Sequence, residues 1–468
     1  MSVASPRGVV VSATARRVVV VGNGMAGARF TEELLSRDPA AQITVVGAED
    51  RPTYNRVLLS DVLSGKRGAG EIGLPGGGAA VRRLGTPVTA LDRTGRTATL
   101  ADGEVLPYDV LVLATGSTAV VPPVHGIAGP SGLLLPGVHV FRTLQDCDLI
   151  AAAAGRARKA VVVGGGLLGL EAARGLLAHG LQVDVVHGTS HLMDVQLDAL
   201  GGAVLRRAVE ALGVGVHLGS FASSVTGSRR VTGVGLADGR HVDGDLVVLA
   251  CGVRPETTLA REAGLAVERG VLVDDRLATD DPHVFALGEC SQHLGQVYGL
   301  VAPAWEQAAV LADVLTGGGS RYTGSRTVAR LKAMDLDLAA MGEVAPGLED
   351  CFSGASEGLE VLQFADPVRH VYKKLVLRDG VVVGAVLLGD LSTAGPVTQA
   401  FDRATPLPAD RLHLLFAGLS SGPPAEAADS DVVCTCNGVT AGALRTCGAR
   451  TVPEAALATR ATTGCGTC

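Results

Sequence analysis

Two glycine-rich turns constrain the fold of this chain more than any other feature. The first, GNGMAG at residues 22–27, lies between strands expected at 17–21 and 42–46 and opens a helical stretch. The second, GGGLLG at residues 164–169, follows a strand expected at 159–163 in the same way. A glycine turn between a strand and a helix is the setting that a dinucleotide-binding fingerprint requires. The sequence therefore predicts an α/β chain with two Rossmann-like units.

The two turns also predict which residues contact a cofactor. Glycines let the backbone approach a pyrophosphate, and the helix N-terminus that follows offers N–H groups and a partial positive charge. One unit would hold a flavin dinucleotide and the other an exchangeable nicotinamide dinucleotide; the alternative is that one unit has lost its ligand. The residues expected at these turns are Gly22, Gly24, Met25, Ala26 and Gly27 in the first unit, and Gly164, Gly166, Leu168 and Gly169 in the second.

Further candidates for cofactor contacts lie near the ends of other expected strands. They are Glu49, Arg56, Thr115, Gly116, Gly252, Gly288 and Glu289. The Glu49 carboxylate is placed to accept a hydrogen bond from a ribose hydroxyl, as an acid after the second strand does in this fold. Arg56 either pairs with a pyrophosphate or is a solvated arginine. No catalytic acid, base or nucleophile is expected, because hydride and electron transfer need only position and electrostatics from the protein.

Two positions in the second unit leave alternatives open. His187 stands where such a unit usually has an acid for the nucleotide ribose, and no arginine follows at 188–190 to grip a 2′-phosphate. It is either a ribose-facing residue or a solvated strand end, so the expected nucleotide is NAD(P), with a lean towards NAD. Glu171 either faces the nicotinamide ribose or is an ordinary acid near a helix N-terminus.

Cysteines crowd the C-terminal end of the chain. Of nine in total, two form a C-x-C pair and two a C-x-x-C pair; these are Cys434, Cys436, Cys465 and Cys468. Four thiolates in two close pairs could hold zinc, a single iron or an iron–sulfur cluster. The alternatives are disulfides or an empty site. Cys447 lies between the pairs and is expected to be a small buried residue rather than a ligand.

Several segments together carry a family resemblance. They are VVVGNGMAGARFTEELL, YNRVLLS, YDVLVLATGS, FRTLQD, AVVVGGGLLGLEAARGL, DPHVFALGEC and GLVAP. The chain resembles the FAD- and NAD(P)H-binding part of the large subunit of assimilatory NAD(P)H nitrite reductases, and the electron-transfer subunits of assimilatory nitrate reductases. Its C-terminal cysteines resemble the [2Fe-2S] domain of bacterioferritin-associated ferredoxin.

The resemblance implies a glutathione-reductase-like architecture with the NAD domain inserted into the FAD domain. It places the FAD domain at 16–122 and 245–325 and the NAD(P) domain at 123–244. An α+β interface domain follows at 326–418. Outside these lie a disordered tail at 1–15, a linker at 419–430 and the [2Fe-2S] module at 431–468.

The resemblance also implies a function. FAD, NAD(P)H and a [2Fe-2S] cluster would together turn two-electron flow into single-electron steps. Thiol chemistry is not expected, because residues 54–60 contain no cysteine. The chain ends without the further cysteines of a sirohaem centre, so we expect electrons to pass to a separate nitrate or nitrite reductase subunit. The alternatives are a ferredoxin or rubredoxin reductase with a structural metal, and a redox-sensing scaffold without turnover.

Composition excludes other classes of protein. The net charge of −7 and an aromatic content of 3% argue against a nucleic-acid partner. No run of about 18 apolar residues suggests a membrane helix. A short apolar stretch near the N-terminus is interpreted as a frayed tail rather than a signal peptide, so a cytoplasmic location is expected. A homo-oligomer remains possible.

Overall fold

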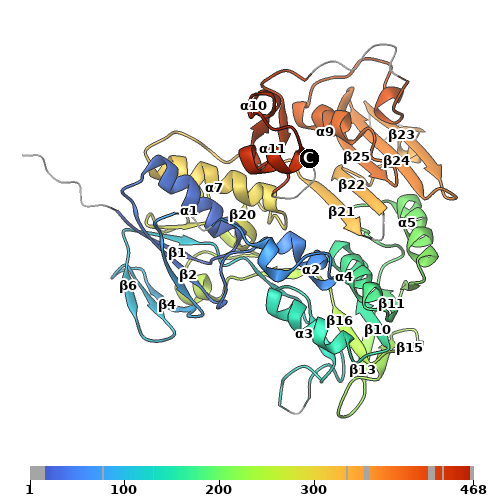
Figure 1. The fold of residues 1–468 in the computed structure, drawn as a ribbon, viewed down its shortest axis with the longest axis horizontal. Coiled ribbons are helices and arrows are strands. Elements are labelled where there is room, and N and C mark those ends of the chain that lie inside the picture. Colours follow the sequence, from blue (N-terminus) through green and yellow to red (C-terminus); the bar gives the residue numbers. More distant parts are fainter. Residues whose placement is uncertain are drawn as a thin grey trace, which may run out of the picture.

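The computed structural model describes residues 16–75, 78–129, 131–333, 336–352, 358–419, 427–434 and 437–463. Within these ranges the chain forms three five-stranded sheets, smaller sheets and the helices that cover them (Figure 1). The expected tail and most of the linker lie outside the described residues. So do three of the four candidate metal ligands, Cys436, Cys465 and Cys468.

The first glycine turn belongs to a parallel sheet with the strand order β19-β7-β1-β2-β3. Two long helices, α1 and α7, run beside each other along this sheet (Figure 1). Phe30 of α1 and Leu311 of α7 are fully buried in the core between them and the strands. The elements are β1 (Arg17–Val21), α1 (Met25–Arg37), β2 (Gln42–Gly47), β3 (Val81–Leu84), β7 (Val110–Leu113), β19 (Val284–Ala286) and α7 (Val301–Leu315).

The second glycine turn belongs to another parallel sheet, ordered β12-β11-β10-β16-β9. Helices α3, α4 and α5 accompany it. The two glycine units are therefore built alike, as the sequence predicts. The elements are β9 (Val138–Val140), α3 (Leu144–Ala154), β10 (Lys159–Val163), α4 (Leu167–Ala178), β11 (Gln182–His187), α5 (Ala199–Ala211), β12 (Gly215–Leu218) and β16 (Leu246–Leu249).

The structure corrects one expected boundary. We expected the second part of the FAD domain to begin at residue 245, but β16 pairs with β10 and β9 in the second sheet. Both units use a similar apolar strand, 110–113 in one and 246–249 in the other, so the sequence pattern alone does not tell which sheet the later strand completes. The chain returns to the first unit only after β16, where β17 pairs with β8.

Smaller elements join and flank these two units. The three-stranded sheets are β4 (Val88–Asp92) with β5 (Thr97–Leu100) and β6 (Val105–Pro107), and β13 (Ala222–Thr226) with β14 (Gly233–Leu236) and β15 (His241–Asp243). The two-stranded ones are β8 (Ser117–Ala119) with β17 (Val253–Pro255), and β18 (Val271–Val273) with β20 (Ser291–His293). Short helices are α2 (Leu59–Leu63) and α6 (Thr258–Glu262). No helix among the described residues has both the length and the apolar character to cross a bilayer.

The third large sheet is antiparallel, with the order β21-β22-β25-β24-β23. Its strand β24 carries a fully buried lysine, Lys374, whose Nζ lies 2.6 Å from Asp198 Oδ2. Asp198 caps α5, so this ion pair ties the third sheet to the second unit. The elements are β21 (Val328–Ala333), β22 (Leu336–Gly342), α8 (Leu348–Phe352), β23 (Leu359–Asp366), β24 (Val371–Arg378), β25 (Val381–Leu388) and α9 (Ala394–Arg403).

The C-terminal segment folds back onto the first unit, close to α7 and α9 (Figure 1). Cys434 is buried in a cluster with Met25, at the start of α1, and Trp305 of α7. An ion pair from Arg460 to Glu32 of α1, at 2.5 Å, adds to this contact. The segment contains β26 (Val432–Cys434), β27 (Val439–Thr440), α10 (Ala441–Thr446) and α11 (Val452–Thr459).

Candidate dinucleotide-binding site

A cavity of about 1810 Å³ joins the two glycine units and reaches the C-terminal segment at Val432 and Val433. It exceeds the roughly 300–1,000 Å³ of an ordinary small-molecule pocket, so it has room for more than one ligand. Gly27, Gly164, Gly169, Gly288 and His187 are not among its lining residues. The expected site residues that line it are Gly22, Gly24, Met25, Ala26, Glu49, Arg56, Thr115, Gly116, Gly166, Leu168, Glu171, Gly252 and Glu289.

The first glycine turn fits a closely bound phosphate group. Gly22 has φ +124°, and a Cβ there would lie 2.1 Å from the Ala114 carbonyl oxygen. A Cβ on Gly27 would lie 2.1 Å from the Gly22 carbonyl oxygen. These two glycines are therefore required by the packing of the chain itself. Gly24 differs: a Cβ there would meet nothing within 4 Å and would project into the open cavity.

The second turn repeats this division of roles. Gly164 has φ +120°, and its added Cβ would lie 2.2 Å from the Ala250 carbonyl oxygen. A Cβ on Gly169 would lie 1.9 Å from the Gly164 carbonyl oxygen, whereas one on Gly166 would meet nothing within 4 Å. Both turns thus leave a bare backbone face next to the cavity, which is the form that a pyrophosphate needs.

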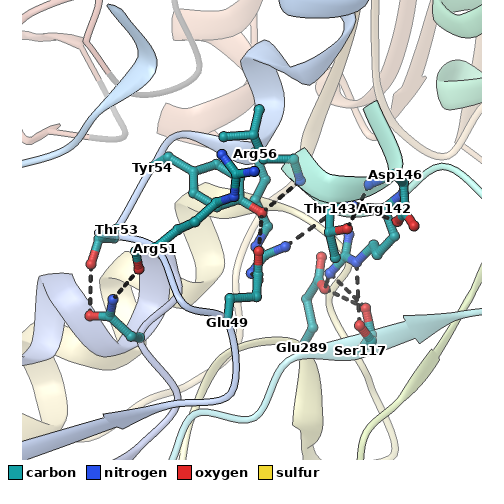
Figure 2. A network of polar contacts seen from close by, with 12 residues as sticks. Glu49, Arg51, Thr53, Tyr54, Arg56, Ser117, Arg142, Thr143, Asp146 and Glu289 are labelled. Carbon is teal, nitrogen blue, oxygen red and sulfur yellow. Dashed lines mark hydrogen bonds and ion pairs between the residues drawn. The ribbon is translucent and has the colours of Figure 1, made fainter. Parts of the chain in front are cut away.

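Glu49 and Arg56 form an ion pair at the edge of the cavity (Figure 2). The Tyr54 hydroxyl donates to the same carboxylate at 2.7 Å, and burial raises the pKa of Tyr54 to about 12, which keeps this donor protonated. Glu49 and Arg56, both expected from the sequence to contact a cofactor, are therefore paired with each other. A carboxylate has about four acceptor positions, so Glu49 retains the capacity to accept from a ribose.

A second network lies beside the first. Glu289 accepts from the Ser117 hydroxyl at 2.6 Å and pairs with Arg142, whose Nη2 also donates to Ser117 Oγ at 2.8 Å (Figure 2). Glu289 is a residue expected from the sequence, whereas Ser117 and Arg142 are site residues that the sequence pattern did not predict. Ser117 is the last residue of the ATGS segment that follows β7, and Arg142 lies in the FRTLQD segment that follows β9, so position after a strand was the available signal.

Four further candidates follow strands of the two units. Thr115 Oγ1 donates to the Glu256 carbonyl oxygen at 2.7 Å. Gly288 donates its N–H to Gln307 Oε1 of α7 at 2.7 Å, so this group is already satisfied within the protein. Gly116 and Gly252 have φ values of +72° and +92°, and an added Cβ on either would meet nothing within 4 Å. Gly116 and Gly252 therefore line the cavity, whereas Gly288 does not.

Glu171 is the most perturbed acid of the cavity. Burial raises its pKa to about 7; a hydrogen bond from Ser60 opposes this shift, and the Asp61 charge adds to it. Glu171 therefore changes its charge close to neutral pH. A perturbed acid inside a cavity is typical of a functional site.

His187 lies at the end of β11 and outside the cavity lining. Its Nδ1 accepts the Gly165 N–H at 3.1 Å, and its Nε2 lies 2.8 Å from Thr189 Oγ1. In the structure, His187 therefore contacts the backbone of the second glycine turn through Gly165. Contact with a nucleotide remains a prediction for this residue.

The described part of the cysteine module contains one of the four expected ligands. Cys434 is 1% exposed, and Asn437 Nδ2 lies 3.8 Å from its sulfur. No group of three histidine, cysteine or acidic side chains that could hold a metal occurs among the described residues. Since Cys436, Cys465 and Cys468 are not among them, the metal site remains a prediction.

Three cysteines far from the C-terminal segment do not offer a reactive thiolate. Burial raises the pKa of Cys147 and of Cys251 to about 11 and also raises the pKa of Cys290. These thiols stay protonated at neutral pH.

The fold and site define an FAD-dependent NAD(P)H oxidoreductase. The chain belongs to the pyridine nucleotide-disulphide oxidoreductase family, whose profile matches residues 16–308. A second profile, the rubredoxin NAD+ reductase C-terminal domain, matches residues 328–405. The fold class predicted for these parts of the chain, and the class of enzyme, are confirmed.

Individual relatives agree with the predicted resemblance. Over 97% of its length the chain is 37% identical to the NAD(P)H nitrite reductase of Bacillus subtilis (strain 168). Over 97% it is also 34% identical to the assimilatory nitrate reductase electron transfer subunit of the same organism. It spans 56% and 58% of these two relatives. A solved ferredoxin reductase from Rhodopseudomonas palustris superposes with a TM-score of 0.73 at 26% identity, covering 84% of this chain and 96% of that one.

Proposed function

We propose that this chain oxidises NAD(P)H through bound FAD and passes single electrons to a [2Fe-2S] cluster at its C-terminal cysteines. From there the electrons would go to a separate nitrate or nitrite reductase subunit. The observation that carries the proposal is the burial of Cys434 against Met25, the residue that opens α1 and lines the cavity. This contact puts one candidate cluster ligand against the wall of the cofactor cavity.

The first unit would hold FAD. Gly22, Gly24 and the start of α1 would face its pyrophosphate, and Glu49 its ribose. The Arg142–Glu289–Ser117 network, which lies beside the Glu49–Arg56 pair, would shape the same part of the cavity. Bound there, FAD supplies a group that accepts hydride and releases electrons one at a time.

The second unit would hold the nicotinamide nucleotide. Gly166 and Leu168 would face its pyrophosphate, and Glu171, five residues after Gly166 on α4, also lines the cavity. The continuity of the cavity between the two glycine turns supports a nicotinamide placed against the flavin. The chain's own contribution is to position the two ligands and to exclude water between them.

The position of the C-terminal segment favours transfer within one chain. Arg460 pairs with Glu32 of α1, and Asn55 donates to the Thr463 carbonyl oxygen at 3.2 Å. On the other side of the segment, Arg403 of α9 pairs with Asp431 at 2.7 Å. Contacts on two sides hold Cys434 in place next to the first unit.

Replacement of a ligand cysteine tests the proposal. Cys434→Ser should lower the iron and acid-labile sulfide content and abolish NADH-driven reduction of cytochrome c, while NADH still bleaches the flavin. Cys447→Ser, in the same segment, is the matched control and should retain both. Unchanged iron content and cytochrome c reduction in the Cys434 variant would overturn the assignment.

A second candidate function is a ferredoxin- or rubredoxin-type reductase whose C-terminal cysteines hold a structural metal. The match of residues 328–405 to the rubredoxin NAD+ reductase C-terminal domain favours it. Metal analysis separates the two: this candidate requires zinc without acid-labile sulfide in the purified protein.

A further inference from the structure

The Asp194 carboxylate lies next to His187, the last residue of β11, although the sequence pattern does not single out Asp194. Asp194 Oδ1 lies 3.3 Å from His187 Nε2, seven positions away along the chain. The Asp194 side chain is 32% exposed and the His187 side chain 14%, so the carboxylate is the accessible member of the pair. The end of the second strand is where a dinucleotide-binding unit places the acid for the adenosine ribose.

The hydrogen bonds of His187 define the orientation of its ring. Nδ1 accepts the Gly165 N–H. Nε2 lies 2.8 Å from Thr189 Oγ1 and 3.3 Å from Asp194 Oδ1. The imidazole therefore orients the Asp194 carboxylate.

A second contact ties Asp194 to the glycine turn. The residue before it, Met193, donates its N–H to the Gly165 carbonyl oxygen at 3.0 Å. Gly165 thus binds His187 through its N–H and Met193 through its carbonyl, and a Cβ on it would lie 2.9 Å from His187 Cγ. Asp194 is fixed relative to the turn that would carry the pyrophosphate.

Two basic side chains near this edge, His191 and Arg240, make other contacts. His191 Nε2 lies 3.1 Å from the Leu197 carbonyl oxygen. Arg240 donates to the carbonyl of Leu218, the β12 partner of His187, but its guanidinium is paired with Asp238 at 2.7 Å. Neither residue offers a free positive charge for a 2′-phosphate.

We propose that Asp194, oriented by His187, accepts a hydrogen bond from the adenosine 2′-hydroxyl and selects NADH over NADPH. The inference rests on the proposed function, in which the second unit binds the nicotinamide nucleotide. An anionic acceptor gains a hydrogen bond from the hydroxyl and repels the phosphate that replaces it in NADPH.

Equilibrium titration of the oxidised holoenzyme with NAD+ and with NADP+ tests this without turnover. Asp194→Asn should reduce the ratio of the two dissociation constants, Kd(NADP+)/Kd(NAD+), by about tenfold or more, the effect of losing one charged hydrogen bond. In turnover it should raise KM for NADH and leave kcat at saturation unchanged. Asp243→Asn is the control, since Asp243 makes a similar 3.3 Å pair with His241 on β15.

The outcomes separate this inference from the proposed function. A ratio in Asp194→Asn equal to that of the wild type and of Asp243→Asn, with both nucleotides still bound, would overturn the role of Asp194 alone. Wild-type protein that binds neither nucleotide would overturn both. A wild-type ratio below one, indicating a preference for NADP+, would also refute the selection of NADH.

Discussion

Trp305 donates its indole N–H to the Met25 carbonyl oxygen at 3.3 Å and so fastens α7 to the first turn of α1. The guanidinium of Arg29 lies over the same indole, 5.3 Å from the ring centroid. Cys434 is buried against both Trp305 and Met25. One tryptophan thus joins the glycine turn of the first unit to the cysteine segment.

Removing this side chain should loosen the C-terminal segment. Trp305 is 4% exposed, so Trp305→Ala is expected to cost about 3–5 kcal/mol in free energy of unfolding. Limited proteolysis should then cut within residues 427–463 faster than in the wild type. Trp305→Phe, which keeps an aromatic ring in the cluster, should be affected much less. Equal protection of the segment in Trp305→Ala and wild type would show that α7 does not hold it.

Alanine substitutions at Gly24 and Gly166 should show which glycine turn binds FAD and which binds the nicotinamide nucleotide. Gly24 and Gly166 have φ near −85° (−86° and −83°), which alanine adopts freely, and an added Cβ meets only the cavity. Gly24→Ala is therefore expected to fold normally but to retain several-fold less FAD after purification. Gly166→Ala should keep its FAD and show a raised KM for NADH. Visible absorption and steady-state kinetics check this, and the reverse pattern would contradict the assignment of the two units.

The perturbed pKa of Glu171 predicts a pH dependence of stability. Its folded-state pKa of about 7 lies above the ordinary value of 4.5, so the folded protein holds this proton more tightly than the unfolded chain. The resulting stabilisation is fully present below pH 4.5 and is lost as the pH rises through 7. Glu171→Gln should therefore gain up to about 3 kcal/mol relative to wild type between pH 4.5 and pH 8.

Urea unfolding of the holoenzyme at these two pH values measures the effect of Glu171→Gln. Glu210→Gln, at an exposed acid on α5 paired with Arg206, is the control and should show no such gain. A difference between Glu171→Gln and wild type that is the same at both pH values would contradict the account.

The buried ion pair between the second unit and the third sheet predicts a stability change. Asp198→Asn leaves Lys374 fully buried without its counter-charge, so a loss of about 3–5 kcal/mol is expected. Asp390→Asn should cost less, because Asp390, the partner of Lys373, is 43% exposed. Combining Asp198→Asn with Lys374→Met should recover most of the loss, because both charges are then removed. Thermal unfolding measures all three variants, and a melting temperature for Asp198→Asn equal to that of the wild type would contradict the prediction.

Local sterics explain what could be predicted from the sequence. A strand followed by a glycine turn and a helix has few solutions, and the expected strands at 17–21 and 159–163 are those observed. The same constraint located Gly24 and Gly166 correctly at the cavity.

Contacts between distant parts of the chain explain what could not be predicted. Arg142 and Glu289 belong to different elements, and no spacing rule connects them. Asp194 lies beyond residues 188–190, where an arginine for the phosphate would be expected, and its position near His187 depends on how the loop folds back onto Gly165. The boundary at 245 was misplaced because β7 of the first unit and β16 of the second are nearly interchangeable in pattern.

An anaerobic titration of the purified protein with NADH, followed by visible absorption and low-temperature EPR, tests the proposed electron path. We expect the flavin to bleach and a rhombic EPR signal of a reduced [2Fe-2S] cluster to appear in the same titration. Flavin bleaching without an iron signal would contradict it, because electrons would then have no one-electron carrier next to the cavity.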